Sequence, residues 1–289
     1  MISGTKLRVL TASVLMPLVV AAIWWGPNWL LAVLAGAIAV LTLLEFFRVG
    51  AQIGMKGYRL WTCLAAAVIF VWQWYAARAA SNLRLGDLLY EVRTPRISLD
   101  IVLFFFLIGL AVIALASRRP VSEVFSSVSI SAAGLIVIVL PFSAVVRLQG
   151  VDTFGPLLLL FTVVLVWVGD SSAYFAGRTF GRWKMSPEIS PGKTWEGAFA
   201  NLLGALLVGA IFGYWTKIPP IHMLAMAGFA SIAGQVGDLF ESAFKRSAGV
   251  KDSGTILPGH GGMWDRIDAL ILAAPAVWYY FEWVVLRRK

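Results

Sequence analysis

The sequence is poor in charged residues and in cysteine. Charged residues make up 13% of the 289 residues, whereas hydrophobic residues make up 60%. A water-soluble domain carries about twice that share of charge, so the apolar surface of this chain requires a bilayer as its solvent. The single cysteine, Cys63, lies in an apolar run. This excludes an internal disulfide and a cysteine-based metal site.

The charge balance is basic, with a net charge of +9. Lysine and arginine are common in the loops of membrane proteins, which accounts for such an excess. The excess also suits attraction to anionic lipid or to a polyphosphate substrate, and the two explanations are compatible. No basic run is long enough to follow a nucleic-acid backbone, so we expect no nucleic-acid partner.

Long apolar runs fill the sequence. About 20 apolar residues are needed to cross a hydrocarbon core of about 30 Å, and the runs lack the alternation of barrel strands, so helices are the expected spanning form. The sequence therefore predicts an all-α polytopic membrane protein. N-terminal transmembrane helices are expected in 1–150 and a C-terminal transmembrane catalytic region in 151–289, within one integral membrane unit. About nine spans are expected, near residues 8–25, 29–47, 60–77, 100–116, 124–146, 154–177, 197–215, 221–245 and 267–286.

The distribution of lysine and arginine over the connections predicts the orientation. More of them fall on the side of the N-terminus, and cytoplasmic loops carry such an excess, so we expect that side to be cytoplasmic. Two long polar connections, 178–196 and 246–266, are separated by two predicted spans and are expected on this same side.

Acidic residues inside the predicted spans concentrate in the second half of the chain. Asp170 and Asp238 each lie about seven residues before the end of a span, which corresponds to about 10 Å of helix. Both spans run toward the same face, so the two carboxylates are expected at matching depth. A carboxylate within a span costs about 2.5–3.5 kcal/mol on insertion scales, and it therefore normally has a partner or a function.

Further polar residues follow Asp238 at helical spacing. Glu241, Ser242 and Lys245 come three, four and seven residues later, so all four side chains share one helix face. The sequence thus predicts a polar stripe at the end of this span.

The last predicted span begins with a second acidic pair, Asp265 and Asp268, which also share a face. If this span packs against the one that carries Asp238, the carboxylates converge on one pocket. Clustered carboxylate oxygens suit Mg²⁺. The alternative is a set of ion pairs that only hold the helices together, for which the nearby basic residues are Lys245, Arg246, Lys251 and Arg266.

The segment Ser190–Gly197 leads into a predicted span and contains Gly192, Lys193 and Thr194. Free N–H groups and the helix dipole at such an N-terminus favour an anion, so we expect a phosphate there. A P-loop is excluded, because Pro187 stands where that motif needs glycine and no βα unit surrounds it. The alternative is a plain helix cap beside a lysine that reaches the membrane surface.

Two isolated titratable residues have simpler interpretations. Glu45 lies near the end of the second span beside Arg48, which is typical of an ion pair at the membrane surface. His260 precedes Gly261 and Gly262, and such glycines let the backbone approach a ligand closely. We expect His260 to contact substrate, since a histidine in a glycine-rich loop is more often a hydrogen-bonding spacer than a base.

Residues 242–268, SAFKRSAGVKDSGTILPGHGGMWDRID, resemble the signature of the phosphatidate cytidylyltransferase (CDP-diacylglycerol synthase) family of bacterial type. Residues 170–178 and 190–197 are similar to two other blocks of that family. The three blocks lie within 170–268, and residues 1–150 match only as a string of spans.

The resemblance implies the reaction of CTP with phosphatidate to give CDP-diacylglycerol and pyrophosphate. It also implies Mg²⁺, with a second cation such as K⁺, and a site that faces the cytoplasm from the bacterial inner membrane. We predict metal binding by Asp238 and Asp265, with Asp268, Asp170 and Glu241 close by. The predicted catalytic residues are Asp238, Asp265, Lys193, Lys245 and Arg246. The predicted substrate contacts are Ser190, Lys193, Thr194, Ser242, Lys251, Asp252, His260, Gly261, Gly262 and Arg266.

Three other functions are weighed against this one. A CTP-dependent lipid kinase acting on a polyprenol uses similar metal and phosphate contacts, but its neutral alcohol requires a general base. A secondary transporter would have related halves with interrupted helices near mid-bilayer, whereas the acids here crowd one end of the sequence. A structural scaffold does not need so many acids. The sequence does not fix the oligomeric state, and a homodimer is compatible with it.

Overall fold

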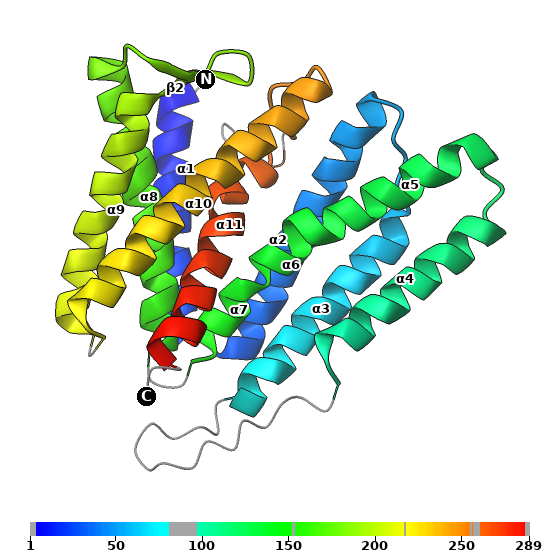
Figure 1. Ribbon diagram of the computed structural model, residues 1–289, viewed down its shortest axis with the longest axis horizontal. Coiled ribbons are helices and arrows are strands. Elements are labelled where there is room, and N and C mark those ends of the chain that lie inside the picture. Colours follow the sequence, from blue (N-terminus) through cyan, green and yellow to red (C-terminus); the bar gives the residue numbers. More distant parts are fainter. Residues whose placement is uncertain are drawn as a thin grey trace. The chain divides into compact units, whose positions relative to one another are not determined.

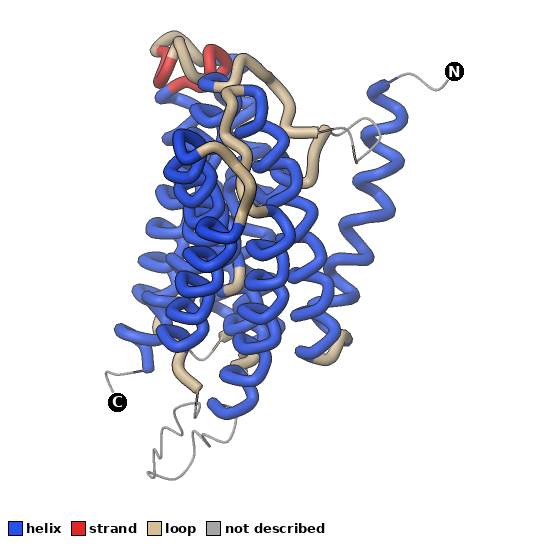
Figure 2. The backbone as a smooth tube through the Cα atoms, turned by 90° about the vertical axis from the view of Figure 1, so that its right-hand side faces the viewer, coloured by secondary structure: helices blue, strands red, loops and turns tan. Residues whose placement is uncertain are grey.

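The computed structural model describes residues 4–80, 97–151, 154–216, 218–254, 256 and 261–286, and the side chains of these residues except 4–12, 79 and 80. Helices make up most of the described backbone (Figure 2). Eight of the described helical segments are long and apolar enough to cross a membrane, and Ser13–Trp25 is a shorter apolar helix. The predicted all-α polytopic fold is confirmed, and the chain is an integral membrane protein.

The chain divides into two compact units. Unit 1 contains Met1–Pro156 and Ala248–Asp265, and unit 2 contains Leu157–Ser247 and Arg266–Lys289. The first break falls after Pro156. The polar segment Ala248–Asp265, however, groups with the N-terminal helices, although its sequence neighbours lie in unit 2.

Unit 1 is a set of apolar helices, of which α2, α3, α4 and α5 lie side by side (Figure 1). Helices α2, α3 and α4 are each long and apolar enough to span a bilayer, because charged residues are confined mainly to their ends, and α5 is the first part of a longer span. The elements are α1 (Gly4–Trp25), α2 (Asn28–Gln52), α3 (Arg59–Ala80), α4 (Leu99–Ala116), α5 (Val121–Gly134), a π-helical turn (Leu135–Val139), α6 (Leu140–Phe142) and α7 (Ala144–Gln149).

The segment Val121–Gln149 forms one spanning unit despite its division into four pieces. Its π-helical turn precedes Pro141, whose ring clashes with the preceding helical turn and which has no N–H to donate. The wider turn accommodates this proline within the span. Buried amides join the end of the segment to other helices, because Asn28 Nδ2 donates to Gln149 Oε1 at 3.0 Å and Gln73 Nε2 donates to Ser143 Oγ at 2.8 Å.

Unit 2 consists of long helices and one short hairpin. Its elements are α8 (Gly155–Phe180, from Leu157 onward), β1 (Lys184–Ser186), β2 (Ser190–Thr194), α9 (Trp195–Trp215), α10 (Pro220–Ser247), α11 (Trp264–Tyr280, from Arg266 onward) and a π-helical turn (Phe281–Leu286).

The hairpin lies in the connection 178–196, where the sequence predicted only a polar loop. Strands β1 and β2 are antiparallel, with Lys184 opposite Thr194 and Ser186 opposite Ser190. The pairing continues toward α9, because the N–H of Trp195 donates to the carbonyl of Trp183 at 2.9 Å. The hairpin therefore fixes the direction in which the chain enters α9.

Candidate active site

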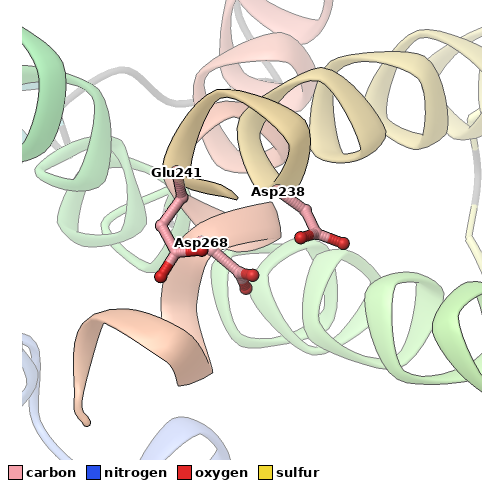
Figure 3. Close-up of side chains that lie close together, drawn as sticks. All are labelled: Asp238, Glu241 and Asp268. Carbon is pink, nitrogen blue, oxygen red and sulfur yellow. The ribbon is translucent and has the colours of Figure 1, made fainter. Parts of the chain in front are cut away.

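Three carboxylates of unit 2 form a compact cluster. Asp238 and Glu241 lie on α10 and Asp268 lies on α11, and one oxygen from each lies within 4.8 Å of the other two. Figure 3 shows the side chains from the two helices extending toward a common region. The predicted convergence of acids from separate spans is thus observed for these three residues.

Glycine brings the backbones of α10 and α11 together beside this cluster. A Cβ atom on Gly237 would lie 2.6 Å from the carbonyl oxygen of Asp268, and one on Gly234 would lie 3.3 Å from that of Ala269. Small residues allow membrane helices to approach closely. Gly237 directly precedes Asp238, so this approach places the Asp238 and Asp268 carboxylates within reach of one ion.

Two lysines contact the cluster. Lys193 Nζ lies 2.7 Å from Asp238 Oδ1, and Lys245 Nζ lies 2.7 Å from Glu241 Oε2. Glu241 and Lys245 are buried on consecutive turns of α10. Among the described residues, neither Asp268 nor Asp170 forms an ion pair within 4.0 Å. Helix-stabilising ion pairs therefore account for only part of the acidic set.

The oxygen set fits a small divalent cation. Oxygens bound to one Mg²⁺ at about 2.1 Å lie up to about 4.2 Å apart, close to the separations within the cluster. Carboxylates are ligands that Mg²⁺ prefers, and Asp238, Glu241 and Asp268 are not all neutralised by lysine. Small side-chain rotations would bring their oxygens to a single ion.

A pocket of about 430 Å³ adjoins the cluster through Asp238. It is lined from α8 by Asp170, from α10 by Gln235 and from the hairpin by Lys193, with the α9 residue Asn201 also at its wall. The predicted site residues that line it are Asp170, Ser190, Lys193, Thr194 and Asp238. Acids and a cation from separate segments thus surround one cavity.

A chain of uncharged polar side chains supports Asp170 in this pocket. Asn201 Nδ2 donates to Asp170 Oδ1 at 3.3 Å, and Ser231 Oγ donates to Asn201 Oδ1 at 2.8 Å. Gln235 Nε2 donates to Ser231 Oγ at 3.2 Å. Asn201, Ser231 and Gln235 were not predicted from the sequence. Polar residues inside predicted spans are the signal that could have drawn attention to them.

Side chains of the protein itself already bind some of the N–H groups at and near the N-terminus of α9. Thr194 is the N-cap, and its Oγ1 accepts the N–H of Gly197 at 3.2 Å. Glu196 Oε1 accepts the N–H groups of Arg182 and Trp183 at 3.0 and 3.2 Å, which ties the hairpin to the helix. The helix cap that was the alternative to a phosphate site is therefore present. Lys193, however, contacts Asp238.

Glu45 does not form the surface ion pair with Arg48 that the sequence predicted. The Glu45 side chain is completely buried in unit 1, and among the described residues no lysine or arginine lies within 4.0 Å of it. Its carboxylate accepts hydrogen bonds from the polar segment before α11 instead. The prediction was wrong because adjacency in sequence does not reveal a partner more than 200 positions away.

Asp265 organises the same segment of unit 1. Its Oδ2 accepts the N–H of Gly262 at 2.8 Å, the N–H of Ser253 at 3.2 Å and approaches Ser253 Oγ at 3.1 Å. Gly261 has a φ of +83°, a region that favours glycine. The sequence did not predict this structural task of Asp265. Because Asp265 lies in unit 1 and Asp238 in unit 2, their joint metal binding stays a prediction.

The other predicted site residues are more dispersed. Arg246 is exposed on α10, and its Nε donates to the Ile189 carbonyl at 3.1 Å. Ser242 is half-buried on the same helix. Lys251, Asp252 and Arg266 are exposed, Gly262 is buried, and His260 lies outside the described residues.

Comparison with known proteins places the chain in a family. Residues 6–284 match the Cytidylyltransferase family. The chain is 32% identical to the phosphatidate cytidylyltransferase of Haemophilus influenzae, over 97% of this chain and 99% of that protein. It is 34% identical to that of Thermotoga maritima, over 68% and 73% of the two chains, and 37% identical to that of Bacillus subtilis, over 63% and 67%.

These matches extend well beyond the three sequence blocks that carry the resemblance. The matched region also includes the helices of unit 1, whose sequences resemble the family only as a string of spans. The chain belongs to the cytidylyltransferase family.

Proposed function

We propose that this enzyme transfers the cytidylyl group of CTP to phosphatidate, which gives CDP-diacylglycerol and pyrophosphate. The observation that carries the proposal is the cluster of Asp238, Glu241 and Asp268 beside a pocket that contains Lys193. Acids alone would repel both anionic substrates. Acids that hold a divalent cation next to a lysine attract them.

Mg²⁺ is the proposed ion, held by Asp238, Glu241 and Asp268, with Asp170 nearby in the pocket. Asp265 remains a predicted ligand on the basis of its sequence block. When bound, the ion supplies positive charge that neutralises phosphate oxygens and the leaving pyrophosphate. A second cation such as K⁺ is proposed on the family resemblance, and replacing K⁺ by choline in the assay tests it.

The reaction requires neither a covalent intermediate nor a strong base. A phosphate oxygen of phosphatidate attacks the α-phosphorus of CTP, and the bond to the β-phosphate oxygen breaks to release pyrophosphate. The nucleophile is already an anion, so the protein must align the two substrates and reduce their repulsion. In the proposed mechanism Lys193, which lines the pocket, binds phosphate oxygens, and Lys245, which pairs with Glu241, lowers the charge of the acidic cluster.

The proposed location is the bacterial cytoplasmic membrane, with the pocket open to the cytoplasm. The lysine and arginine bias of the connections supports this orientation, and CTP is a cytoplasmic nucleotide. The hairpin residue Glu188 is exposed and offers a labelling position. With Cys63 replaced by alanine, a Glu188→Cys variant should react with an impermeant maleimide in inverted vesicles but not in intact spheroplasts.

Product analysis tests the activity. Purified protein is incubated with α-labelled CTP and phosphatidate, with and without Mg²⁺, and lipid and nucleotide products are separated. We expect labelled CDP-diacylglycerol and stoichiometric pyrophosphate only when Mg²⁺ is present. Free CDP formed with a polyprenol acceptor, and no labelled lipid, would instead identify the CTP-dependent kinase reaction.

A further inference from the structure

A carboxylate on the second helix holds the segment that leads into α11. Glu45 of α2 accepts the N–H of Met263 at 3.0 Å and of Trp264 at 2.8 Å, and it accepts the Ser253 hydroxyl at 2.9 Å. We propose that Glu45 is a positioning residue for the cytidylyl transfer, which fixes residues 251–254 and 261–265 in their working conformation. This inference rests on the function proposed above.

The position of Glu45 explains why an acid is required. The N–H groups of Met263 and Trp264 lie at the start of α11, where a helix lacks partners for its first donors and carries partial positive charge. A carboxylate accepts hydrogen bonds from these N–H groups and also balances the partial positive charge of the helix end. Because Glu45 already occupies these donors, they are not available to a substrate phosphate.

Ser253 links Glu45 to a second carboxylate. The buried Ser253 hydroxyl lies 2.9 Å from Glu45 Oε2 and 3.1 Å from Asp265 Oδ2, so its one proton lies between two acceptors. The N–H of Ser253 also donates to Asp265. Glu45 therefore fixes Ser253, and Ser253 in turn fixes the orientation of Asp265, the predicted metal ligand. Such outer contacts set the geometry of the groups that touch an ion.

Glycines allow the backbone to wrap around the Glu45 carboxylate. A Cβ atom on Gly254 would lie 2.5 Å from Glu45 Oε1, and one on Gly262 would lie 2.6 Å from Glu45 Oε2 and 2.0 Å from Ser253 Oγ. Larger residues would displace the carboxylate or the segment. The close packing of two glycines against one carboxylate indicates a specific binding site for Glu45 rather than an incidental contact.

The held segment carries residues with proposed contacts to substrate. Lys251 and Asp252 directly precede Ser253, and both side chains are exposed to solvent. Because Ser253 is hydrogen-bonded to Glu45 and Asp265, the backbone that carries the Lys251 and Asp252 side chains is held in place. A loosened segment would lose the alignment of Lys251, Asp252 and Asp265 together, which lowers the rate without removing any of these groups.

The experiment compares Glu45→Gln with the control Glu123→Gln. Glutamine retains size but replaces one acceptor oxygen by an NH₂ group that faces donors. Glu123 is an acid on α5 of the same unit, and its side chain is only partly buried. Hydrogen exchange of peptides covering 261–266 and steady-state kinetics are measured for both variants and for the unaltered protein.

We expect the amides of Met263 and Trp264 to exchange about tenfold faster or more in Glu45→Gln. The value of kcat/KM for CTP should fall by about 10- to 100-fold in folded protein. Glu123→Gln should change neither quantity. Unchanged protection of these amides in Glu45→Gln, or a lower melting temperature with unaltered kcat and KM, would overturn the positioning role.

Two further variants cover the case in which Glu45→Gln does not fold. Glu45→Asp keeps the charge and should restore part of the protection and part of the activity. Ser253→Ala removes the link to Asp265, and its kinetic effect should not add fully to that of Glu45→Asp; full additivity would overturn the linkage. Absence of cytidylyl transfer by the unaltered protein would refute the proposed function, whereas the exchange measurement tests the Glu45 contacts independently of activity.

Discussion

Lys193 of β2 lies 2.7 Å from Asp238 of α10, measured from Nζ to Oδ1. The ion pair joins the hairpin to the acidic cluster at the wall of the pocket. The lysine is only partly exposed, with 25% of its side-chain surface accessible. Its charge is therefore weakly screened and can act on both the carboxylate and an incoming phosphate.

Lys193→Ala should impair the use of CTP while leaving membrane insertion intact. Loss of a cation that stabilises phosphate charge should lower kcat/KM for CTP by about 10²- to 10³-fold. Lys184→Ala is the matched control, since Lys184 is an exposed lysine on the neighbouring strand. Equal kinetics for Lys193→Ala and the control would rule out phosphate binding by Lys193.

The Asp268→Asn variant should show whether the acidic cluster binds a metal ion or only forms structural ion pairs. Mg²⁺ at 100 times its dissociation constant should stabilise the unaltered protein by about 2.7 kcal/mol, which raises its melting temperature. The variant should show a smaller shift and should require more Mg²⁺ for half-maximal activity. A full Mg²⁺ shift in Asp268→Asn, measured by differential scanning fluorimetry in detergent, would remove Asp268 from the site.

Asp265→Asn should abolish turnover in protein that still inserts and purifies normally. The comparison with Ser253→Ala distinguishes two tasks of Asp265, because Ser253 shares its hydrogen bonds but is not a predicted ligand. If Asp265 binds the ion, the asparagine variant loses far more activity than Ser253→Ala in an assay over a range of Mg²⁺. Equal losses would mean that Asp265 only shapes the segment.

Gly237→Ala should disturb the cluster without altering any acidic residue. The added methyl group would lie 2.6 Å from the Asp268 carbonyl, so α10 and α11 must separate locally. Gly228→Ala on the same helix is the control, because its nearest neighbour is Leu206 Cδ2 at 4.0 Å. We expect reduced turnover and weaker Mg²⁺ dependence in the first variant alone. Normal kinetics in Gly237→Ala would show that the close approach is not needed.

Asn201→Ala should reduce activity because it removes the hydrogen bond that orients Asp170. Asn201 donates to Asp170 and accepts from Ser231, so its loss frees the carboxylate to turn. A loss of about 10-fold or more in kcat/KM is expected for an orienting contact of this kind. Thr162→Val on α8 serves as the control, since among the described residues the Thr162 hydroxyl donates only to the Leu158 carbonyl of its own helix. Parallel losses in both variants would indicate a general packing defect.

Local spacing predicted the acidic face of α10 because helical periodicity alone places Asp238, Glu241 and Lys245 together. It also predicted that Asp268 would join them if the two spans pack together, and the close approach of Gly237 to Asp268 shows that they do. The hairpin before α9 was not predicted, because its two strands are short and largely polar and therefore leave no hydrophobic alternation to detect. Asn201 and Gln235 were overlooked because a neutral polar residue in a span gives a weaker signal than a charge.

The sequence by itself determined that this is a membrane protein of apolar helices, with its acids gathered toward one end of the chain. Those properties follow from composition and from periodicities of a few residues, which need no knowledge of distant partners. Only the tertiary structure decided which groups satisfy one another: Lys193 with Asp238, Asn201 with Asp170, and Glu45 with Trp264. A buried polar group must find a partner wherever the fold brings one, and for Glu45 that partner lies 219 residues away.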